Sequence, residues 1–451
     1  MPVQIDPARV EELTGQQSAA LAEKLPRSIE FAKRASQSLA GGVACSWHAL
    51  EPHTIYGSRG AGSRIWDLDG NEYVDMHAAY GVMVVGHAHP KVVETVRERV
   101  GLGTQFAMPV EDTVVVAELL SERFGQPLWR FKNSGSEATM EASRIMRAAT
   151  GRDLLIKVEG SYHGSSDGLA WSYWVDPAQA GPADRPTAVP NTGGVPDAFG
   201  SVLRIVPFND LGAVERVLAE EGDRVAGMIL EPILMNAGVI RPVAGYLEGL
   251  RELLHRHGAL LAFDEVKTGV TIASGGATEW TGVRPDVVAL AKAIGGGVPI
   301  AAVGGTEEAM RVYLDGTLEG EGTFNGNPLS MAVSRVVLSE ILTPEVYERF
   351  ETQNARFTAA LQDVIDRHDL PTTVQTVRCR GSLHFNPEPI RNFRGEAAAD
   401  GALQHLAWLY QLNGGVLPPA GDPWTFSVVH EDVHLDRYVE SLEEFAEAVT
   451  A

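Results

Sequence analysis

The chain has 451 residues, enough to bury a large core and to divide into two or more domains. Its 37 basic and 59 acidic residues give a formal charge of −22, which argues against nucleic acid or an anionic membrane surface as a main partner. No stretch approaches the roughly 18 consecutive apolar residues of a membrane-spanning helix. Because the N-terminus also lacks the features of a secretory signal and the two cysteines, Cys45 and Cys379, are too few for a disulfide framework, we expect a cytoplasmic protein of enzyme size.

The N-terminal part of the chain predicts helix, then a hairpin, then a pair of histidines. Residues 7–40 carry apolar side chains at roughly helical spacing, which indicates helix without chemistry. Asp69 and Gly70 form a turn signal between two strand-like runs. His87 and His89 could bind a metal by their spacing, but no cysteine or third ligand accompanies them. We therefore expect no metal site.

A predicted strand at residues 129–133 leads into a hydroxyl- and glycine-bearing segment, Ser134 to Glu137, and a helix that ends near Thr150. A helix that begins with such residues offers backbone N–H groups and the positive end of its dipole to a phosphate. Ser134 and Glu137 also have the spacing of a capping box. Both interpretations can hold at once.

Two features of the next stretch predict a binding surface. A strand at 153–158 is followed by Tyr162, which could stack on an aromatic cofactor ring or be an ordinary packing residue. Residues 171–200 are rich in proline, glycine and alanine and show no periodicity. A loop this long inside a compact domain is typical of a lid or a substrate wall.

Strands and helices then alternate, with strands at 202–206 and 225–230 and helices at 211–221 and 245–257. Strand–helix units of this spacing predict an α/β fold with a mostly parallel sheet. A further strand is expected at 300–305.

Within this alternation, two short apolar runs end in Asp264 and Lys292. Because ligands of open α/β sheets bind at the carboxyl ends of the strands, both side chains should lie at one crevice. A lysine and a carboxylate there suggest a Schiff-base cofactor, with the acid as partner of a pyridinium nitrogen. The alternative is that Asp264 merely ends a strand and Lys292 is solvated.

The last part of the chain differs in character. A glycine-rich turn at 322–328 precedes a helix near Leu329, and beyond about residue 335 two amphipathic helices flank short strands at 377–385 and 424–429. We expect three units. They are an N-terminal segment, 1–65, packed on a small domain; a large domain, 66–334; and the smaller α+β C-terminal domain, 335–451.

Seven motifs occur in order along the chain, beginning at Trp66, Gly86, Asn133, Tyr162, Asp264, Lys292 and Gly322. With these motifs the chain, from about Gly41 to His430, specifically resembles class III pyridoxal-phosphate (PLP)-dependent aminotransferases of fold type I, in the branch of glutamate-1-semialdehyde aminomutase. This resemblance implies a homodimer that uses PLP and acts on a small-molecule amino donor and a carbonyl acceptor.

The resemblance also implies roles for individual residues. Lys292 would form the Schiff base and move a proton, Asp264 would keep the ring nitrogen protonated, and Tyr162 and Val266 would cover the two ring faces. Gly135 and Ser136 would hold the phosphate, and Thr323 would reach the phosphate site of the neighbouring subunit. The full set of expected cofactor contacts is Ser134, Gly135, Ser136, Tyr162, His163, Glu231, Asn236, Asp264, Val266, Lys292 and Thr323.

The chain departs from the aminomutase branch where that branch carries a carboxylate-binding arginine. Trp47 and His48 stand about there, and they suit an aromatic or less charged substrate. The aminomutase branch also usually carries an acidic residue near its C-terminus, and in this chain the shorter acid Asp422 stands there. We therefore expect a ping-pong aminotransferase for an amino acid, a β-amino acid or an amine.

Three alternatives remain. The first is an aminomutase acting on glutamate-1-semialdehyde. The second is a catalytically silent binding protein with the same fold, against which the joint presence of Lys292, Asp264, Tyr162 and Thr323 argues. The third makes Lys267 the covalent anchor, but it lacks the glycine-rich surroundings of Lys292.

Overall fold

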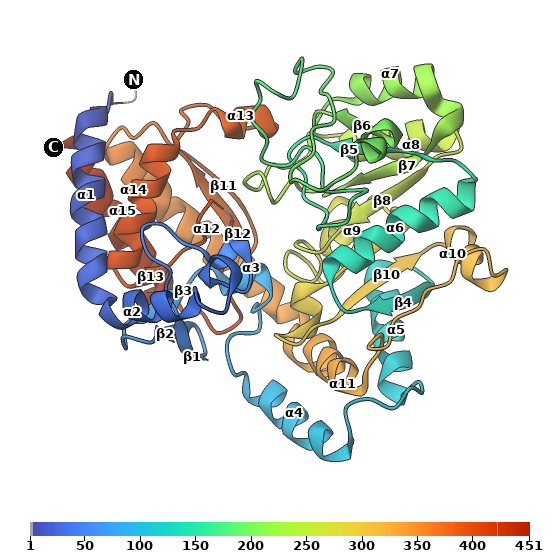
Figure 1. The fold of residues 1–451 in the computed structure, drawn as a ribbon, viewed down its shortest axis with the longest axis horizontal. Helices are drawn as coiled ribbons and strands as arrows, with labels where there is room; N and C mark the ends of the chain where they lie inside the picture. The colour runs from blue at the N-terminus through green and yellow to red at the C-terminus, as the bar shows by residue number, and fades with distance from the viewer. Residues whose placement is uncertain (1–2, 422) are drawn as a thin grey trace.

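A seven-stranded sheet forms the centre of the computed structural model, which describes residues 3–421 and 423–451 (Figure 1). The strand order is β4 (Leu128–Lys132), β10 (Ala301–Gly305), β9 (Val287–Leu290), β8 (Leu260–Asp264), β7 (Val225–Leu230), β5 (Leu154–Val158) and β6 (Leu203–Val206). All pairings are parallel except the two made by β10. The predicted α/β fold with a mostly parallel sheet is confirmed.

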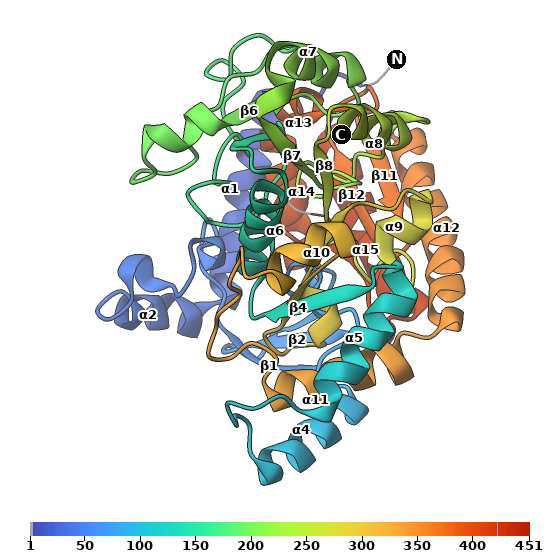
Figure 2. The same ribbon diagram turned by 90° about the vertical axis from the view of Figure 1, so that its right-hand side faces the viewer.

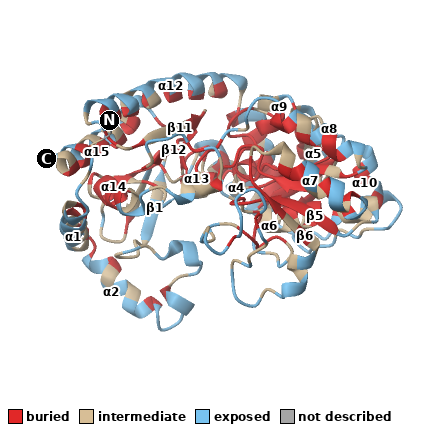
Figure 3. Cartoon of the chain, turned by 90° about the horizontal axis from the view of Figure 1, so that it is seen from above, coloured by how far each residue is buried: buried red, intermediate tan, exposed pale blue. Residues whose placement is uncertain are grey.

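The strands are parallel because helices return the chain across the sheet between them. These crossovers include α6 (Gly135–Thr150), α7 (Leu211–Glu221) and α8 (Tyr246–Arg256). Every residue of β5, β7 and β9 is buried, as expected for strands covered on both faces. Figure 3 shows this buried sheet surrounded by partly exposed helices.

Helices α4 (Pro90–Leu102), α5 (Glu111–Phe124) and α11 (Pro328–Val336) extend from the β4 side of the sheet (Figure 2). Helix α11 packs against both α4 and α5. Helix α9 (Gly276–Thr281) contacts α5, and α10 (Glu307–Leu314) packs on α6.

The N-terminal residues form two helices and most of a second sheet. The predicted helix breaks at Pro26, giving α1 (Pro7–Lys24) and α2 (Pro26–Ala35). Strands β1 (Gly57–Ala61), β2 (Arg64–Asp67) and β3 (Glu72–Asp75) pair antiparallel in that order, and the predicted Asp69–Gly70 turn joins β2 to β3. The short strand β13 (Val416–Leu417) pairs with β3, so this sheet spans the predicted boundary at residue 65. The three-unit division stays a prediction.

The C-terminal part corrects two expectations. It holds α12 (Pro344–Arg367), α13 (Phe393–Ala397), α14 (Gly401–Asn413) and α15 (Asp432–Thr450), where only two helices were expected. Helix α14 escaped prediction because it is buried on most sides and therefore lacks an amphipathic period. The strand expected at 377–385 is a hairpin, β11 (Thr373–Val377) and β12 (Arg380–His384), and β14 is limited to Trp424–Thr425.

The loop expected at 171–200 contains no helix or strand until a short 3-10 turn at Asp197–Val202. It is nevertheless anchored, because Trp171 is buried in a core cluster and bridges to Pro190. Across residues 3–421 and 423–451, no helix combines the length and the apolar character needed to cross a membrane.

Candidate active site

Asp264 is the last residue of β8, and its carboxylate is buried and fixed by two groups. One oxygen lies 2.6 Å from Nδ1 of His163, and the other accepts the backbone N–H of Val266 at 3.0 Å. Strand β8 ends at the sheet edge toward which β5 and β7 also run. The carboxylate is therefore held where the sequence predicted it.

A second acid fixes the turn that follows. Glu265 is fully buried and accepts hydrogen bonds from the hydroxyls of Thr268 and Thr278 and from the backbone of Ala277 and Thr278. Burial raises the pKa of this carboxyl. The turn consequently holds Val266 and Lys267 in defined places beside Asp264.

Lys292 follows β9 and begins the 3-10 turn Lys292–Gly295. Its φ of +52° is in the left-handed region, which costs a non-glycine residue about 1–2 kcal/mol. Strain of this kind persists where the surroundings impose it, and it concentrates at functional sites. The backbone of Lys292 is therefore held in an uncommon conformation, and the residue itself is half-buried.

The N-terminus of α6 provides a cradle beside these groups. Ser134 caps the helix and forms the predicted capping box with Glu137. The N–H groups of Gly135 and Ser136, one residue further on, have no acceptor inside the helix by virtue of their position. An added Cβ at Gly164 would lie 2.4 Å from Oγ of Ser136, so only glycine lets these segments approach so closely.

One cavity of about 370 Å³ is lined by nearly all the residues that were predicted to contact the cofactor. Its walls include Ser134, Gly135, Ser136, Tyr162, His163, Glu231, Asn236, Asp264, Val266 and Lys292. Thr323 is not among them. It is exposed, and its carbonyl accepts from the side-chain amide of Gln105.

Glu231, at the end of β7, organises one wall of this cavity. Its carboxylate accepts the backbone N–H groups of Tyr162 at 3.0 Å, Met235 at 2.9 Å and Asn236 at 3.1 Å. Burial raises the pKa of this group, and the nearby charges of His163 and Lys267 oppose that shift. Burial likewise raises the pKa of Tyr162 to about 12, so this tyrosine stays protonated.

A buried lysine that the sequence analysis overlooked lies behind the same wall. Lys157 interrupts the otherwise apolar strand β5 and donates to the carbonyls of Val158 and Ser161 and to the Ser161 hydroxyl. These bonds hold the turn that delivers Tyr162 and His163. Burial lowers the pKa of Lys157 to about 7.

This depressed pKa predicts a pH-dependent stability. Below about pH 7 the ammonium is charged in both states, whereas between that pH and its ordinary value of 10.5 only the unfolded chain holds the extra proton. The free energy of unfolding should therefore rise with pH across this window, by at most about 1.4 kcal/mol per pH unit. Lys157→Met should remove that part of the slope. Denaturant unfolding of both proteins at pH 7 and pH 9 would measure it, and equal slopes would contradict the assignment.

A second cavity, of about 490 Å³, adjoins the first and shares Trp47, Tyr162, Asn236, Lys267 and Lys292 with it. The sequence-predicted pair Trp47 and His48 lies on its wall, in the 3-10 turn Ser46–His48. Asp422 lies outside the described residues. His87, the metal alternative, bonds to Asp75 at 2.5 Å, and among the residues described no cluster of three metal-binding side chains occurs.

The first cavity has the groups that PLP requires. The amine of Lys292 faces the same space as the Asp264 carboxylate, and the α6 N-terminus lies beside them for a phosphate. His163 Nε2 is buried without a hydrogen-bond partner among the described residues, which leaves a polar atom for a ligand or water. The fold and the site together define an α/β enzyme with a PLP site.

Comparison with known proteins identifies the family. The model for "Aminotransferase class-III" matches residues 48–393, and the chain belongs to this family of PLP-dependent enzymes, which act on small molecules. It is 37% identical over 422 residues to glutamate-1-semialdehyde 2,1-aminomutase 2 of Brevibacillus brevis, covering 92% of this chain and 97% of that one.

Two solved structures extend the comparison. An omega-transaminase from Sphaerobacter thermophilus has a TM-score of 0.90 and 30% identity, over 94% of this chain and 98% of that one. A glutamate-1-semialdehyde-aminomutase from Pseudomonas aeruginosa PAO1, in complex with PMP, has a TM-score of 0.91 and 28% identity, over 99% and 100% of the two chains. The fold type I assignment is confirmed, and the cofactor is PLP.

Sequence reasoning missed three contributors to the site. Lys157 had a detectable signal, since it is the one charged residue in a strand of apolar neighbours. Tyr173 and Trp174 lie in the long loop, where the run Trp171 to Trp174 is unusually aromatic. Nothing in the local sequence shows that these rings meet Tyr162.

Proposed function

We propose that the protein is an intermolecular aminotransferase that moves an amino group between an amino acid, β-amino acid or amine and a carbonyl acceptor by a ping-pong mechanism. The observation that carries the proposal is the convergence of Lys292, Asp264 and the α6 N-terminus on one cavity. A covalent amine, an anion for a ring nitrogen and a phosphate cradle together are what this chemistry needs.

Each group has a proposed task. When bound, PLP withdraws electrons from the carbon that carries the amine. Lys292 would hold the cofactor covalently and, when its amine is free, would take up and return the proton at its Nζ. Asp264, held by His163 and the Val266 N–H, keeps the ring nitrogen protonated. Tyr162 and Val266, which both line the cavity, would cover the two faces of the ring.

The remaining cofactor contacts support these tasks. Ser134, Gly135 and Ser136 hold the phosphate at the helix N-terminus. Asn236 would lie near the ring hydroxyl, and Glu231 keeps Asn236 and Tyr162 in place through their backbones. His163 positions Asp264.

We also propose a homodimer in which Thr323 completes the phosphate site of the neighbouring subunit. Two observations support the homodimer. Thr323 does not line the cofactor cavity of its own chain. Exposed apolar side chains lie next to it in the sequence, at Phe324 (60% exposed), and on the α4–α5 segment, at Leu102 and Met108 (69% exposed each). Light scattering that gave a monomer mass for the holoenzyme would overturn the homodimer.

We propose a cytoplasmic location because both cysteines are free, and cell fractionation would test it.

The alternative, an aminomutase, is favoured by the similarity to proteins named glutamate-1-semialdehyde 2,1-aminomutase. Against it stands the chemistry of the walls. No arginine lines either cavity in the part of the chain that the structure describes, and Trp47 and His48 line the second cavity. A bidentate grip on a substrate carboxylate is therefore absent from these walls.

Half-reaction spectroscopy tests the proposal. Addition of an amino donor alone should convert the visible absorbance of the holoenzyme to that of the amine form of the cofactor, and an α-keto acid should restore it. If no donor in a broad panel causes this change, the aminotransferase proposal fails. Formation of 5-aminolevulinate from glutamate-1-semialdehyde without any added donor would instead support the aminomutase.

A further inference from the structure

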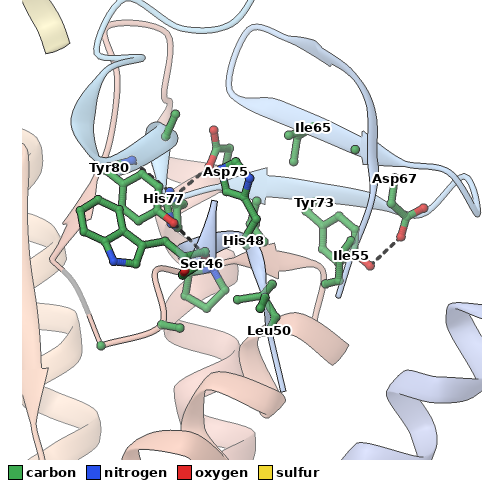
Figure 4. Close-up of a pocket in the computed structure, with 18 of the residues that line it drawn as sticks. Ser46, His48, Leu50, Ile55, Ile65, Asp67, Tyr73, Asp75, His77 and Tyr80 are labelled. Atoms are coloured by element: carbon green, nitrogen blue, oxygen red, sulfur yellow. Dashed lines mark hydrogen bonds between the residues drawn. The ribbon is translucent and has the colours of Figure 1, made fainter. Parts of the chain in front are cut away.

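The second cavity forms a chamber whose lining includes Lys292 and residues of the N-terminal sheet. Figure 4 shows the sheet side of this chamber, with Ile65 and Tyr73 on its wall. Its volume of about 490 Å³ falls in the range of sites that enclose a drug-sized molecule. Lys267 and Lys292 lie at the end shared with the cofactor cavity, and Ile65 and Tyr73 lie at the sheet end. A substrate whose amine reaches Lys292 would therefore extend its remaining atoms into this chamber.

Five aromatic rings surround the junction of the two cavities. Trp47 lies 5.2 Å from Tyr162 and 5.2 Å from Tyr80 between ring centroids. Trp174 is nearly parallel to Tyr162, with 9° between the planes and 6.2 Å between centroids, and Tyr173 meets Tyr162 at 4.9 Å. These rings come from four separate segments, so the fold has assembled them at this place.

The rings are fixed although two of them are exposed. Trp174 donates its indole N–H to the carbonyl of Asn236 at 3.0 Å, and Tyr80 donates its hydroxyl to the carbonyl of Trp47 at 3.0 Å. Tyr80 belongs to a left-handed turn, α3 (Ala78–Gly81), whose strained backbone is characteristic of functional sites. Trp47 is 38% and Trp174 45% exposed, an apolar surface that a ligand would cover.

Among the described residues, the far end of the chamber offers no lysine or arginine for a second carboxylate. The histidines on its walls are His48, His77 and His87, and His87 is already bonded to Asp75. Its walls include the aliphatic side chains of Leu50, Ile55 and Ile65. The acids there are already bonded, Asp67 to the side chains of Asn71 and Tyr73, and Asp75 to His87.

The two ammonium groups of the described lining, Lys267 and Lys292, both lie at the cofactor end. A distal carboxylate would therefore lose its hydration without gaining a lysine or arginine partner at the far end.

We propose that the amino donor carries a bulky apolar group, best an aromatic ring, and no distal carboxylate, and that Trp47, Tyr80 and Trp174 receive that group. This substrate class rests on the proposed aminotransferase function. It follows from the aromatic junction, the aliphatic wall and the placement of charge along the chamber.

The test uses the full-length holoenzyme and compares 1-phenylethylamine with alanine and 4-aminobutyrate in the half-reaction. We expect kcat/KM for the aromatic amine to exceed that for either small donor by at least about tenfold. Trp174→Ala should lower this aromatic-to-small ratio by about tenfold, because it removes one wall for the ring. Leu314→Ala, which removes an exposed apolar side chain from the end of α10, is the matched control and should leave the ratio as it is.

Ala49→Phe provides a second variant should Trp174→Ala not fold. Ala49 is an exposed residue of the chamber wall, and a phenyl ring there should reduce kcat/KM more for 1-phenylethylamine than for alanine. Preference for 4-aminobutyrate, or equal losses for both donors, would overturn the substrate class while leaving an aminotransferase. Failure of every donor to change the absorbance would refute the aminotransferase function itself.

Discussion

Lys292→Ala is expected to lower kcat by a factor on the order of 10⁴ or more, because it removes both the covalent anchor and the group that moves the proton. Lys292 lines the cofactor cavity and lies two residues after the end of β9, with a left-handed φ of +52°. Alanine at this site should leave the fold intact. Single-turnover rates and the visible spectrum of the variant would measure the loss.

Lys267→Ala is the matched comparison, since Lys267 also lines both cavities. Borohydride treatment of the holoenzyme should fix the cofactor on the peptide that contains Lys292, and mass spectrometry would identify that peptide. Lys267→Ala should still give the adduct, whereas Lys292→Ala should not. An adduct on Lys267 in the wild-type protein would contradict the proposed anchor.

The sheet and the position of the site were predictable because parallel strands buried on both faces leave a strong mark in the sequence. Two short apolar runs, one ending in Asp264 and the other leading to Lys292, indicated two buried strands. They also indicated the edge of the sheet at which the side chains of Asp264 and Lys292 would meet. The capping box at Ser134 is equally local, since it depends on a spacing of three residues.

Features that depend on contacts between distant segments were not predictable. The chamber joins Trp47, Tyr80 and Trp174, which are far apart in the chain, and no local pattern indicates that they meet. Helix α14 was missed for a related reason, since tertiary burial on most sides erases the amphipathic period. Local patterns therefore located Lys292 and Asp264, and the resemblance pointed to Trp47, whereas the meeting of Trp47 with Tyr80 and Trp174 required the fold.

Asp264→Asn is expected to lower kcat by a factor on the order of 10³, comparable with the loss of a preorganised charge at other active sites. The amide keeps the size of the carboxylate, and its oxygen can still accept the Val266 N–H. It cannot supply the negative charge that a protonated ring nitrogen requires. The variant should therefore bind the cofactor and donor but move the proton slowly, which single-turnover kinetics would detect as a loss in kcat larger than any rise in KM.

Asp286→Asn separates this effect from simple loss of a buried acid. Asp286 precedes β9 at the opposite edge of the sheet, where it bonds to His255 at 2.9 Å and accepts the Leu261 N–H at 2.8 Å. Its replacement should lower the free energy of unfolding and leave kcat close to the wild-type value, because the residue lies outside both cavities. If both variants lost the same activity, the role of Asp264 would be structural; a loss confined to Asp264→Asn places the required charge at the cofactor.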